Sequence, residues 1–367
     1  MPVTPSVIPA NAGIQGEGPG GMPVTPSVIP ANAGIQGRGA RGHACHPLRH
    51  SCERRNPGEG QRHALDVYVA MTIHFKQVTI VGVGLIGGSL GMSLRHHGLA
   101  DRVVGVGRSQ ESLTLAVTCG AIDAYEQDPN TAMQGADLVV LALPVDRYVA
   151  SLQDWKQSLE PGTIVTDVGS VKGTVVEQME SLVPEGVHVV GAHPIAGRET
   201  SGVGAGSRDL FRGAMCLLTP TSRTDSQALR VVRELWVAVG SVVKTMDPVL
   251  HDWVVGGVSH LPHVVAFALV SALMDLQQQT KPAPGFDQGD GDLLDYAGGG
   301  LRDTTRVAAS SPEMWTEICL RNRDNLLPMI DTFELHLRRF KAFIETNDGA
   351  GLEHAITLSR DARRRVR

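Results

Sequence analysis

Short β-branched runs alternate with helically spaced apolar residues through the middle of this 367-residue chain. The runs predict strands at residues 78–81, 102–107, 136–143, 163–166, 187–190, 214–218 and 241–244. Apolar residues at helical spacing predict helices at 85–95 and 225–239. The 136–143 run is apolar almost throughout, as expected of a parallel strand covered on both faces. The alternation predicts an α/β fold over residues 72–245, built on a doubly wound and mainly parallel sheet.

A glycine-rich loop joins the first predicted strand to the helix that follows it. Gly82, Gly84 and Gly87 form G-x-G-x-x-G, with Leu85 and Ile86 between the last two glycines. In a dinucleotide site the first glycine permits a tight turn, the second lets a pyrophosphate approach the backbone, and the third lets the helix pack closely on the strand. Free N–H groups at the helix start then face the phosphates. Strand, loop and helix together predict a Rossmann-type cofactor site formed by these five residues.

The second predicted strand ends where a Rossmann fold contacts the adenosine ribose. A fold that prefers NAD usually places an acidic residue there, about 20 residues beyond the loop. This chain has Arg108 and Ser109 instead, and a guanidinium beside a hydroxyl suits a 2′-phosphate. We therefore expect NAD(P) as the cofactor, with a preference for NADP. The alternative is that Arg108 is a solvated surface charge and that NAD binds.

Three successive strands deliver candidate site residues to the carboxyl edge of the predicted sheet. Leu143 and Pro144 end the 136–143 run, where they would lie beside the nicotinamide. Ser170 and His193 follow the next two runs, and an imidazole with an ordinary pKa near about 6.5 is basic when neutral. We expect Ser170 and His193 to lie together at this edge. Alternatively, Ser170 caps the helix that begins near residue 171, and His193 caps a turn.

Residues 246–362 carry a helical pattern. The segment 251–271 is mostly apolar and long enough for a helix that also packs between subunits. His260 and His263 lie on one face of it, but no third residue completes a metal site. The Pro/Gly/Asp loop at 281–292 lacks the residue order of a calcium site, so no metal is expected.

Three glycines at 298–300 follow, and they bring the backbone close to a ligand or to a neighbouring chain. Arg302 and Arg306 come next. A guanidinium binds a carboxylate through two hydrogen bonds, so either arginine is a candidate for that role.

Composition narrows the class of protein. The formal net charge is -5 and no basic stripe dominates, so nucleic acid is not expected as a partner. No apolar run approaches the about 20 residues that span a bilayer, so no membrane association is expected. Five irregularly spaced cysteines form no disulfide framework, which favours a reduced, cytoplasmic compartment.

Residues 1–71 look foreign to the rest of the chain. The segment MPVTPSVIPANAGIQG begins at residue 1 and again at residue 22, and it is rich in proline and glycine without a helical or strand period. We expect this part to be disordered, and we hypothesise that it is translated repetitive DNA upstream of a start at Met71. The histidines and cysteines between His43 and Cys52 match no standard zinc spacing.

Five motifs, taken in order, resemble the prephenate/arogenate dehydrogenase family of tyrosine biosynthesis. They are VGLIGGSLG, DVGSVK, GAHPIAGRETSG, SHLPH and GGGLRDTTR, and the resemblance covers residues 74–345. It implies a Rossmann domain followed by an all-helical domain that forms a homodimer. It also implies oxidation of prephenate or arogenate at C4, with loss of the ring carboxylate and formation of 4-hydroxyphenylpyruvate or tyrosine.

The resemblance also assigns roles to single residues. His193 would accept the proton of the C4 hydroxyl, and Ser170 would bond the same hydroxyl or the imidazole. Arg306, rather than Arg302, would bind a substrate carboxylate. The other implied substrate-side residues are His263, Glu199, Asp303, Gly299 and Trp315. His260 would be structural, while a surface role for Glu199 and a core role for Trp315 stay open.

Two other classes fit parts of the pattern. A two-domain β-hydroxyacid dehydrogenase needs a catalytic lysine in its helical half, where Lys281 and Lys341 are poorly placed. A catalytically silent dinucleotide sensor would bind the cofactor without turnover. Since no chorismate mutase segment precedes the Rossmann unit and no regulatory module fits after Glu353, we expect a monofunctional enzyme.

Overall fold

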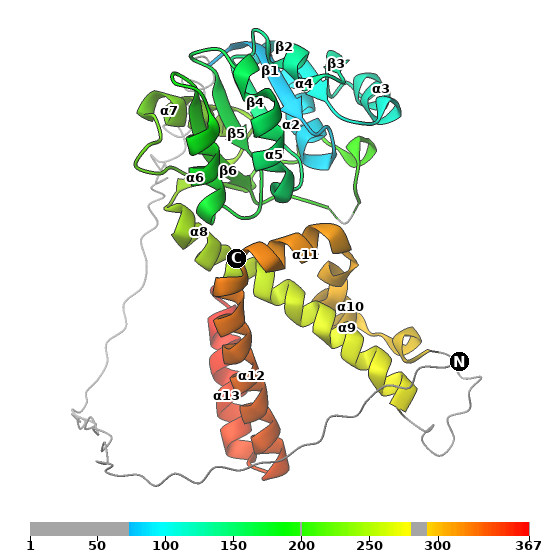
Figure 1. Cartoon of the computed structure of the whole chain (residues 1–367). Coiled ribbons are helices and arrows are strands. Elements are labelled where there is room, and N and C mark those ends of the chain that lie inside the picture. The colour runs from blue at the N-terminus through cyan, green and yellow to red at the C-terminus, as the bar shows by residue number, and fades with distance from the viewer. Residues whose placement is uncertain (1–72, 199, 280–291, 367) are drawn as a thin grey trace, which may run out of the picture. The chain divides into compact units, whose positions relative to one another are not determined.

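The computed structural model describes residues 73–198, 200–279 and 292–366, and its first part is built on one sheet (Figure 1). The strands are β1 (Phe75–Val81), β2 (Ala100–Val106), β3 (Ala124–Glu126), β4 (Leu138–Leu141), β5 (Ile164–Asp167), β6 (His188–Pro194), β7 (Met215–Thr219) and β8 (Val242–Thr245). Their order across the sheet is β3-β2-β1-β4-β5-β6-β7-β8. Every predicted strand is present, and the three-residue β3 is the addition.

The sheet is parallel from β3 to β6, as predicted. β7 then pairs antiparallel with β6, and β8 pairs parallel with β7, so the last two strands run against the rest. The short connections between β1, β4, β5 and their helices leave the carboxyl ends of the parallel strands at one edge, where ligands collect in open α/β sheets.

One predicted position was wrong in detail. We expected His193 in a loop after a strand that ends at residue 190, but β6 continues through His193 to Pro194. The antiparallel partner β7 causes the extension, because Gly191 to Pro194 pair with Thr219 to Cys216 and His193 lies opposite Leu217. The imidazole is therefore mounted on a hydrogen-bonded strand rather than on a loop.

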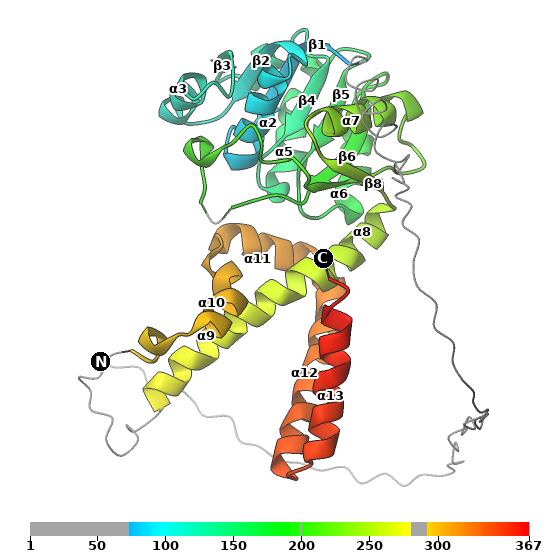
Figure 2. The ribbon, with the colours of Figure 1, turned by 180° about the vertical axis from the view of Figure 1, so that it is seen from behind.

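Helices cover both faces of the sheet. One face packs on α2 (Leu85–His96), α3 (Gln110–Thr118) and α7 (Ser226–Ala238). The other packs on α4 (Pro129–Met133), α5 (Tyr148–Trp155) and α6 (Gly173–Leu182). Figure 1 views the sheet from the side of α5 and α6, and Figure 2 from the side of α7. Short turns of 3-10 helix lie at η1 (Val145–Arg147), η2 (Lys156–Ser158) and η3 (Val203–Ala205).

Strand β4 shows why its sequence is apolar without alternation. Leu138 and Val140 are buried in the core on the α2 side, while Val139 and Leu141 are buried in the core on the α5 side. Because both faces of the central strands are covered, every side chain in such a strand meets apolar neighbours.

The second part of the chain is helical. Its elements are α8 (Pro248–Val255), η4 (Gly256–His260), α9 (Leu261–Gln279), η5 (Leu293–Tyr296), α10 (Gly299–Thr305), η6 (Arg306–Ala309), α11 (Pro312–Arg321), α12 (Arg323–Glu345) and α13 (Gly349–Arg363). In both views α12 and α13 lie side by side, and they are in contact (Figures 1 and 2). Asn347, with φ 53°, turns the chain between them.

The predicted helix at 251–271 is part of a longer one. α8, η4 and α9 follow each other without a break, and η4 is a π-helical turn that ends at His260. Such turns are rare in helices and occur frequently at functional sites.

This helix also corrects the expectation that no segment is long and apolar enough for a bilayer. Pro248–Gln278 spans 31 residues and is long and apolar enough to cross a membrane, by length and composition alone. Only 22% of its most apolar stretch is buried within one chain. Core helices of soluble proteins meet the same two criteria, so length and composition alone do not assign this helix to a membrane.

Candidate active site

The glycine loop between β1 and α2 has the form that a pyrophosphate needs. Gly82 has φ +100°, and a Cβ there would come within 2.5 Å of the Ala142 carbonyl oxygen. A Cβ on Gly87 would overlap the carbonyl oxygen of Gly82, whereas a Cβ on Gly84 would meet nothing within 4 Å. Gly84 precedes Leu85 and Ile86 at the start of α2 without a side-chain cap. The first N–H groups of the helix are therefore available to an anion.

The adenosine end of this site contains the two predicted residues after β2. Arg108 and Ser109 are both exposed. The Ser109 hydroxyl oxygen accepts the Ser112 N–H at 3.2 Å and so caps α3. Its own O–H remains able to donate to a ligand.

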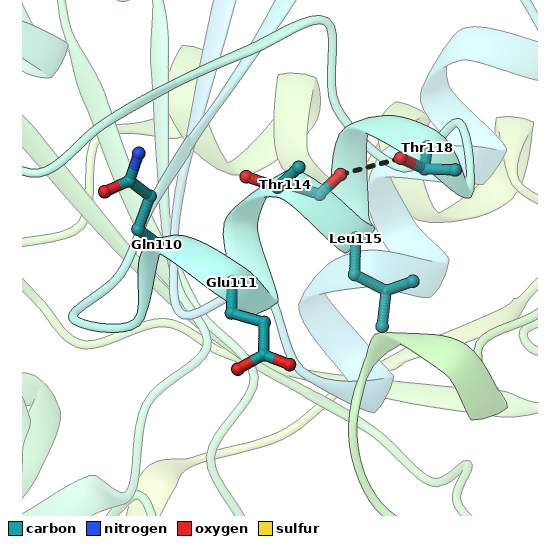
Figure 3. Close-up of a pocket in the computed structure, with 5 residues that line it drawn as sticks. All are labelled: Gln110, Glu111, Thr114, Leu115 and Thr118. Atoms are coloured by element: carbon teal, nitrogen blue, oxygen red, sulfur yellow. Dashed lines mark hydrogen bonds between the residues drawn. The ribbon is translucent and has the colours of Figure 1, made fainter.

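A shallow hollow on α3 is separate from the catalytic candidates. Its lining side chains come from this one helix, as Figure 3 shows, and Thr118 donates a hydrogen bond to the Thr114 carbonyl at 3.0 Å. The lining residues are Gln110, Glu111, Thr114, Leu115 and Thr118. None of them is an imidazole or a guanidinium, so we assign no chemistry to it.

Leu143 and Pro144 follow β4 at the carboxyl edge of the sheet. Leu143 is partly buried, while Pro144 is exposed and precedes η1. The edge beside them carries Ser170 and His193, from the ends of β5 and β6.

His193 is buried at that edge and bonded to a second histidine. Its Nδ1 lies 2.9 Å from Nε2 of His251, which is on α8, and its Nε2 has no hydrogen-bond partner among the described residues. Burial, together with the nearby His251, Lys172 and His260, lowers the pKa of His193 well below its ordinary value. The ring is therefore neutral at physiological pH and can accept a proton.

Asp252 connects the histidines to the start of α6. Its carboxylate accepts the backbone N–H groups of Lys172 at 2.7 Å and Gly173 at 2.8 Å. The same carboxylate lies 2.8 Å from Nδ1 of His251. An acidic side chain from α8 therefore caps the N-terminus of α6, which belongs to the other half of the chain.

Lys172 forms a second buried contact at this point. Its ammonium bonds Asp167 at 2.5 Å and the Gly169 carbonyl at 2.6 Å, and both charged side chains are fully buried. The Asp167 carboxylate also accepts the N–H groups of Gly169 and Ala192. The pair fixes the loop that carries Ser170 against β6.

Ser170 is not the helix cap that the sequence left open. The helix α6 begins at Gly173, its N-cap is Lys172, and no side chain of its own loop caps it. Ser170 is partly buried and makes no hydrogen bond with the other described residues. Asp252 from α8 accepts the N–H groups at the start of α6, so α6 does not need a capping side chain from the preceding loop.

His263 and Trp315 form a stacked pair in the helical part. Their ring centroids are 3.6 Å apart with 20° between the planes. Nδ1 of His263 donates to the Ser259 carbonyl at 2.9 Å. Trp315 is 6% exposed, packs with Val171 and Ile318, and its Nε1 has no partner among the described residues. Trp315 therefore occupies a core position, and its role in a substrate pocket stays a prediction.

Arg306 lies next to this pair. It is exposed and begins η6, which contacts α9. Burial lowers the pKa of His263, and the positive charge of Arg306 lowers it further against the raising effect of the Ser259 carbonyl. The charge of Arg306 thus acts on His263, which is consistent with a place for Arg306 near the stacked pair.

The remaining substrate-side predictions are less constrained. Gly299 and Asp303 are exposed on α10. Glu199 lies outside the described residues. His260 is buried and its Nδ1 lies 2.9 Å from the Asn322 side-chain nitrogen, which agrees with the structural role expected for it. Within the described ranges no cluster of metal-ligating side chains is present.

Two family models match the chain. "Prephenate dehydrogenase, nucleotide-binding domain" covers residues 90–245, and "Prephenate dehydrogenase, dimerization domain" covers residues 247–357. The prephenate dehydrogenase of Bacillus subtilis is 32% identical over 78% of this chain and 75% of its own length. The cyclohexadienyl dehydrogenase of Zymomonas mobilis is 31% identical over 80% of this chain and 96% of its own.

Solved structures agree with these matches. The prephenate dehydrogenase of A. aeolicus, in complex with hydroxyphenyl propionate and NAD+, is 37% identical with a TM-score of 0.72 over 81% of this chain and 99% of its own. The arogenate dehydrogenase of Synechocystis is 31% identical with a TM-score of 0.64 over 78% and 98%. This chain belongs to the prephenate dehydrogenase family.

Membership in the prephenate dehydrogenase family confirms the resemblance and the predicted fold class, a Rossmann-type domain followed by a helical one. It also makes the chain an NAD-binding dehydrogenase rather than a silent sensor. The β-hydroxyacid alternative is not supported, because the matching family models and relatives are prephenate and cyclohexadienyl dehydrogenases. Of its two candidate lysines, Lys341 is exposed and paired with Glu345 at 3.5 Å, and Lys281 lies outside the described residues.

The sequence analysis assigned no role to three buried polar residues near His193. His251 and Asp252 stood inside the segment expected as a helix, and Lys172 stood inside a quoted motif, but none received a role. The available signal was a His-Asp pair in a helix directly after the Asp247-Pro248 start. Two such polar residues in an apolar helix indicate a buried polar contact.

The buried histidines make stability depend on pH. The folded-state pKa of His260 is lowered to about 4, mainly by burial, while the unfolded value is 6.5. Its contribution is therefore complete above about pH 6.5 and is lost as the pH falls toward the folded pKa. We expect His260 alone to remove about 2 kcal/mol of unfolding free energy between pH 7 and pH 5.

Urea unfolding at both pH values, at one protein concentration, measures this loss. The variant His260→Gln should show a smaller difference between the two pH values than the unaltered protein does. Equal pH differences in the two proteins would contradict the assignment.

Proposed function

We propose that this protein catalyses the NAD(P)-dependent oxidative decarboxylation of prephenate, of arogenate, or of both. The products would be 4-hydroxyphenylpyruvate and tyrosine. The observation that carries the proposal is the buried and neutral imidazole of His193 at the carboxyl edge of the sheet, whose Nε2 has no hydrogen-bond partner in the described part of the chain. The names of the relatives, which are prephenate, cyclohexadienyl and arogenate dehydrogenases, supply the substrate class.

His193 is the base in this proposal. Its Nε2 accepts the proton of the substrate C4 hydroxyl, and Ser170 donates to the same oxygen or orients the imidazole. A bound nicotinamide would supply the hydride acceptor for C4, and the ring carboxylate would leave as carbon dioxide. Because aromatisation drives the loss of the carboxylate, the protein has to orient and polarise the substrate rather than form a covalent intermediate.

The helical part holds the substrate. The Arg306 guanidinium binds a substrate carboxylate through two hydrogen bonds. The stacked rings of His263 and Trp315 form an aromatic wall, and the indole N–H has no partner among the described residues. Glu199, Asp303 and Gly299 complete the substrate side, and Asp303 and Gly299 are candidates to reach the site of a partner subunit.

The cofactor binds at the glycine loop. Gly82, Gly84, Leu85, Ile86 and Gly87 would hold the pyrophosphate at the start of α2, and Leu143 and Pro144 would contact the nicotinamide. Arg108 and Ser109 would bind the adenosine ribose. We propose that NADP is accepted and preferred, since no acidic side chain stands at this position to repel a 2′-phosphate.

We propose a homodimer formed through the helical domain. Twenty-four large apolar side chains of the described residues are exposed, of which five precede residue 247 and nineteen follow it. They include Trp253 at 59%, Val258 at 74% and Leu337 at 60%. A surface of this kind is stable in water when a second copy covers it, and the matching domain is described as a dimerization domain.

We also propose the bounds of the two domains and a cytoplasmic location. The nucleotide-binding domain spans residues 72–245 and the helical domain spans 246–362. A cytoplasmic location fits the free cysteines Cys119, Cys216 and Cys319.

Replacement of the base tests the function. Steady-state assays with prephenate and arogenate, each with NAD and NADP, should show turnover for the unaltered protein. His193→Asn should lower kcat by about 10²- to 10⁴-fold, the usual contribution of a general base, while the Kd of the cofactor stays within about twofold. Undiminished turnover by His193→Asn would show that His193 is not the base.

Two arginine variants test the carboxylate site. Arg306→Ala should raise the substrate KM by about 10- to 100-fold, because a charge-assisted hydrogen bond contributes about 1.5–3 kcal/mol. Arg302→Ala, four residues earlier in the same segment, is the matched control and should leave KM nearly unchanged. If the two results are exchanged, Arg302 is the carboxylate ligand.

A third variant tests the cofactor preference. Arg108→Ala should raise the KM for NADP by about tenfold or more and leave the KM for NAD nearly unchanged, since only NADP carries the 2′-phosphate. Arg230→Ala on α7, an exposed arginine elsewhere, serves as the control. An equal change for both cofactors would show that Arg108 does not bind the 2′-phosphate.

A further inference from the structure

A continuous line of hydrogen bonds runs from the backbone of α6 to His193. The N–H groups of Lys172 and Gly173 donate to Asp252. The Asp252 carboxylate is 2.8 Å from Nδ1 of His251, and Nε2 of His251 is 2.9 Å from Nδ1 of His193. All three side chains are buried, with exposed fractions of 5%, 0% and 8% for Asp252, His251 and His193.

The chemistry of the carboxylate fixes the direction of each hydrogen bond. Asp252 accepts one backbone N–H on each of its carboxylate oxygens, and an ionised carboxylate is acceptor-only. Nδ1 of His251 must then carry a proton and donate it. Because burial lowers the pKa of His251 despite its bond to Asp252, the ring is neutral and its Nε2 is an acceptor. Nδ1 of His193 is consequently the donor, and the lone pair of His193 is on Nε2.

We propose that Asp252 and His251 are positioning residues, which hold His193 in the tautomer that a base requires and stabilise its charged form. The inference rests on the proposed function, in which His193 takes the proton of the substrate hydroxyl. Neither residue touches the substrate in this proposal, and both act through His193.

The proton balance is simple. Nε2 of His193 gains the hydroxyl proton, and its Nδ1–H continues to donate to His251. His251 in turn donates to Asp252, so the positive charge on His193 faces a carboxylate through one intervening ring. No proton moves to Asp252, and the proton on His193 returns to solvent after the product leaves.

The other described titratable groups near His193 do not supply a negative charge that could stabilise the charged imidazole, so the Asp252 carboxylate has this role in the proposal. Lys172 and His260 both lower the pKa of His193. The negative charge of Asp167 is offset by its bond to the Lys172 ammonium. Cys216 on β7 accepts the backbone N–H of His193. Asp252 is thus the acidic group that is connected to the His193 imidazole by hydrogen bonds, through His251.

Two substitutions of His251 separate positioning from packing. A glutamine places its carbonyl oxygen near the position of Nε2 and can still accept from His193, whereas an asparagine is too short to do so. We expect kcat to fall by about 10²-fold in His251→Asn and by about tenfold in His251→Gln, with the substrate KM within about twofold in both. His188→Asn, at the opposite end of β6, is the control. Equal losses in the two variants, or a change confined to KM, would overturn the proposal.

A double-mutant cycle distinguishes this proposal from the proposed function. If His251 acts through His193, His251→Gln should have no further effect on kcat in the His193→Asn background. An undiminished tenfold loss there would show that His251 acts independently of His193. A failure of the base assignment appears separately, as full turnover of His193→Asn alone.

The variant Asp252→Asn adds a pH measurement. Loss of the negative charge destabilises charged His193, so its pKa falls and the acidic limb of the kcat–pH profile should move to lower pH. Near-ultraviolet circular dichroism and the cofactor Kd confirm that the variant is folded. A limb that does not move, in a folded variant with normal cofactor affinity, would contradict the role of Asp252.

Discussion

The carboxylate of Asp252 is the contact on which the arrangement of the site depends. Asp252 belongs to α8 in the helical part, and its carboxylate accepts the first N–H groups of α6 in the Rossmann part. The same carboxylate orients His251. A buried carboxylate is costly unless each acceptor position is used, and here backbone and imidazole donors use them. Because the same group satisfies a helix terminus and a histidine, the two parts of the chain cannot shift at this point without leaving a buried polar group unpaired.

The neutrality of His193 follows from the same surroundings. The ring is buried between the end of β6 and α8, and the fully buried Lys172 adds a positive charge nearby. Burial and positive charge both disfavour the charged imidazolium, so the His193 ring is in its neutral, basic form. The antiparallel pairing with β7 then holds the backbone of His193 on a strand, which limits its motion more than a loop would.

The helical part leaves more of its large apolar side chains exposed than the Rossmann part does. Its long apolar helix is poorly covered within one chain, and most of the exposed large apolar side chains lie there. The Rossmann part, by contrast, is covered on both faces of the sheet by its own helices. The first part therefore buries its apolar residues within one chain, whereas the second part leaves many of them exposed.

The sequence by itself determined the order of the strands in the chain, the glycine loop and the residues brought to the carboxyl edge, because these features depend on short-range periodicity and on backbone freedom at single glycines. It did not reveal that β6 continues through His193, because that extension requires β7, which lies more than 20 residues later and runs in the opposite direction. It also gave no role to His251 and Asp252, since their partners are 58 and 80 residues away in the chain. Contacts over such separations have no local pattern, and only the tertiary structure brings a carboxylate, two imidazoles and a helix terminus together.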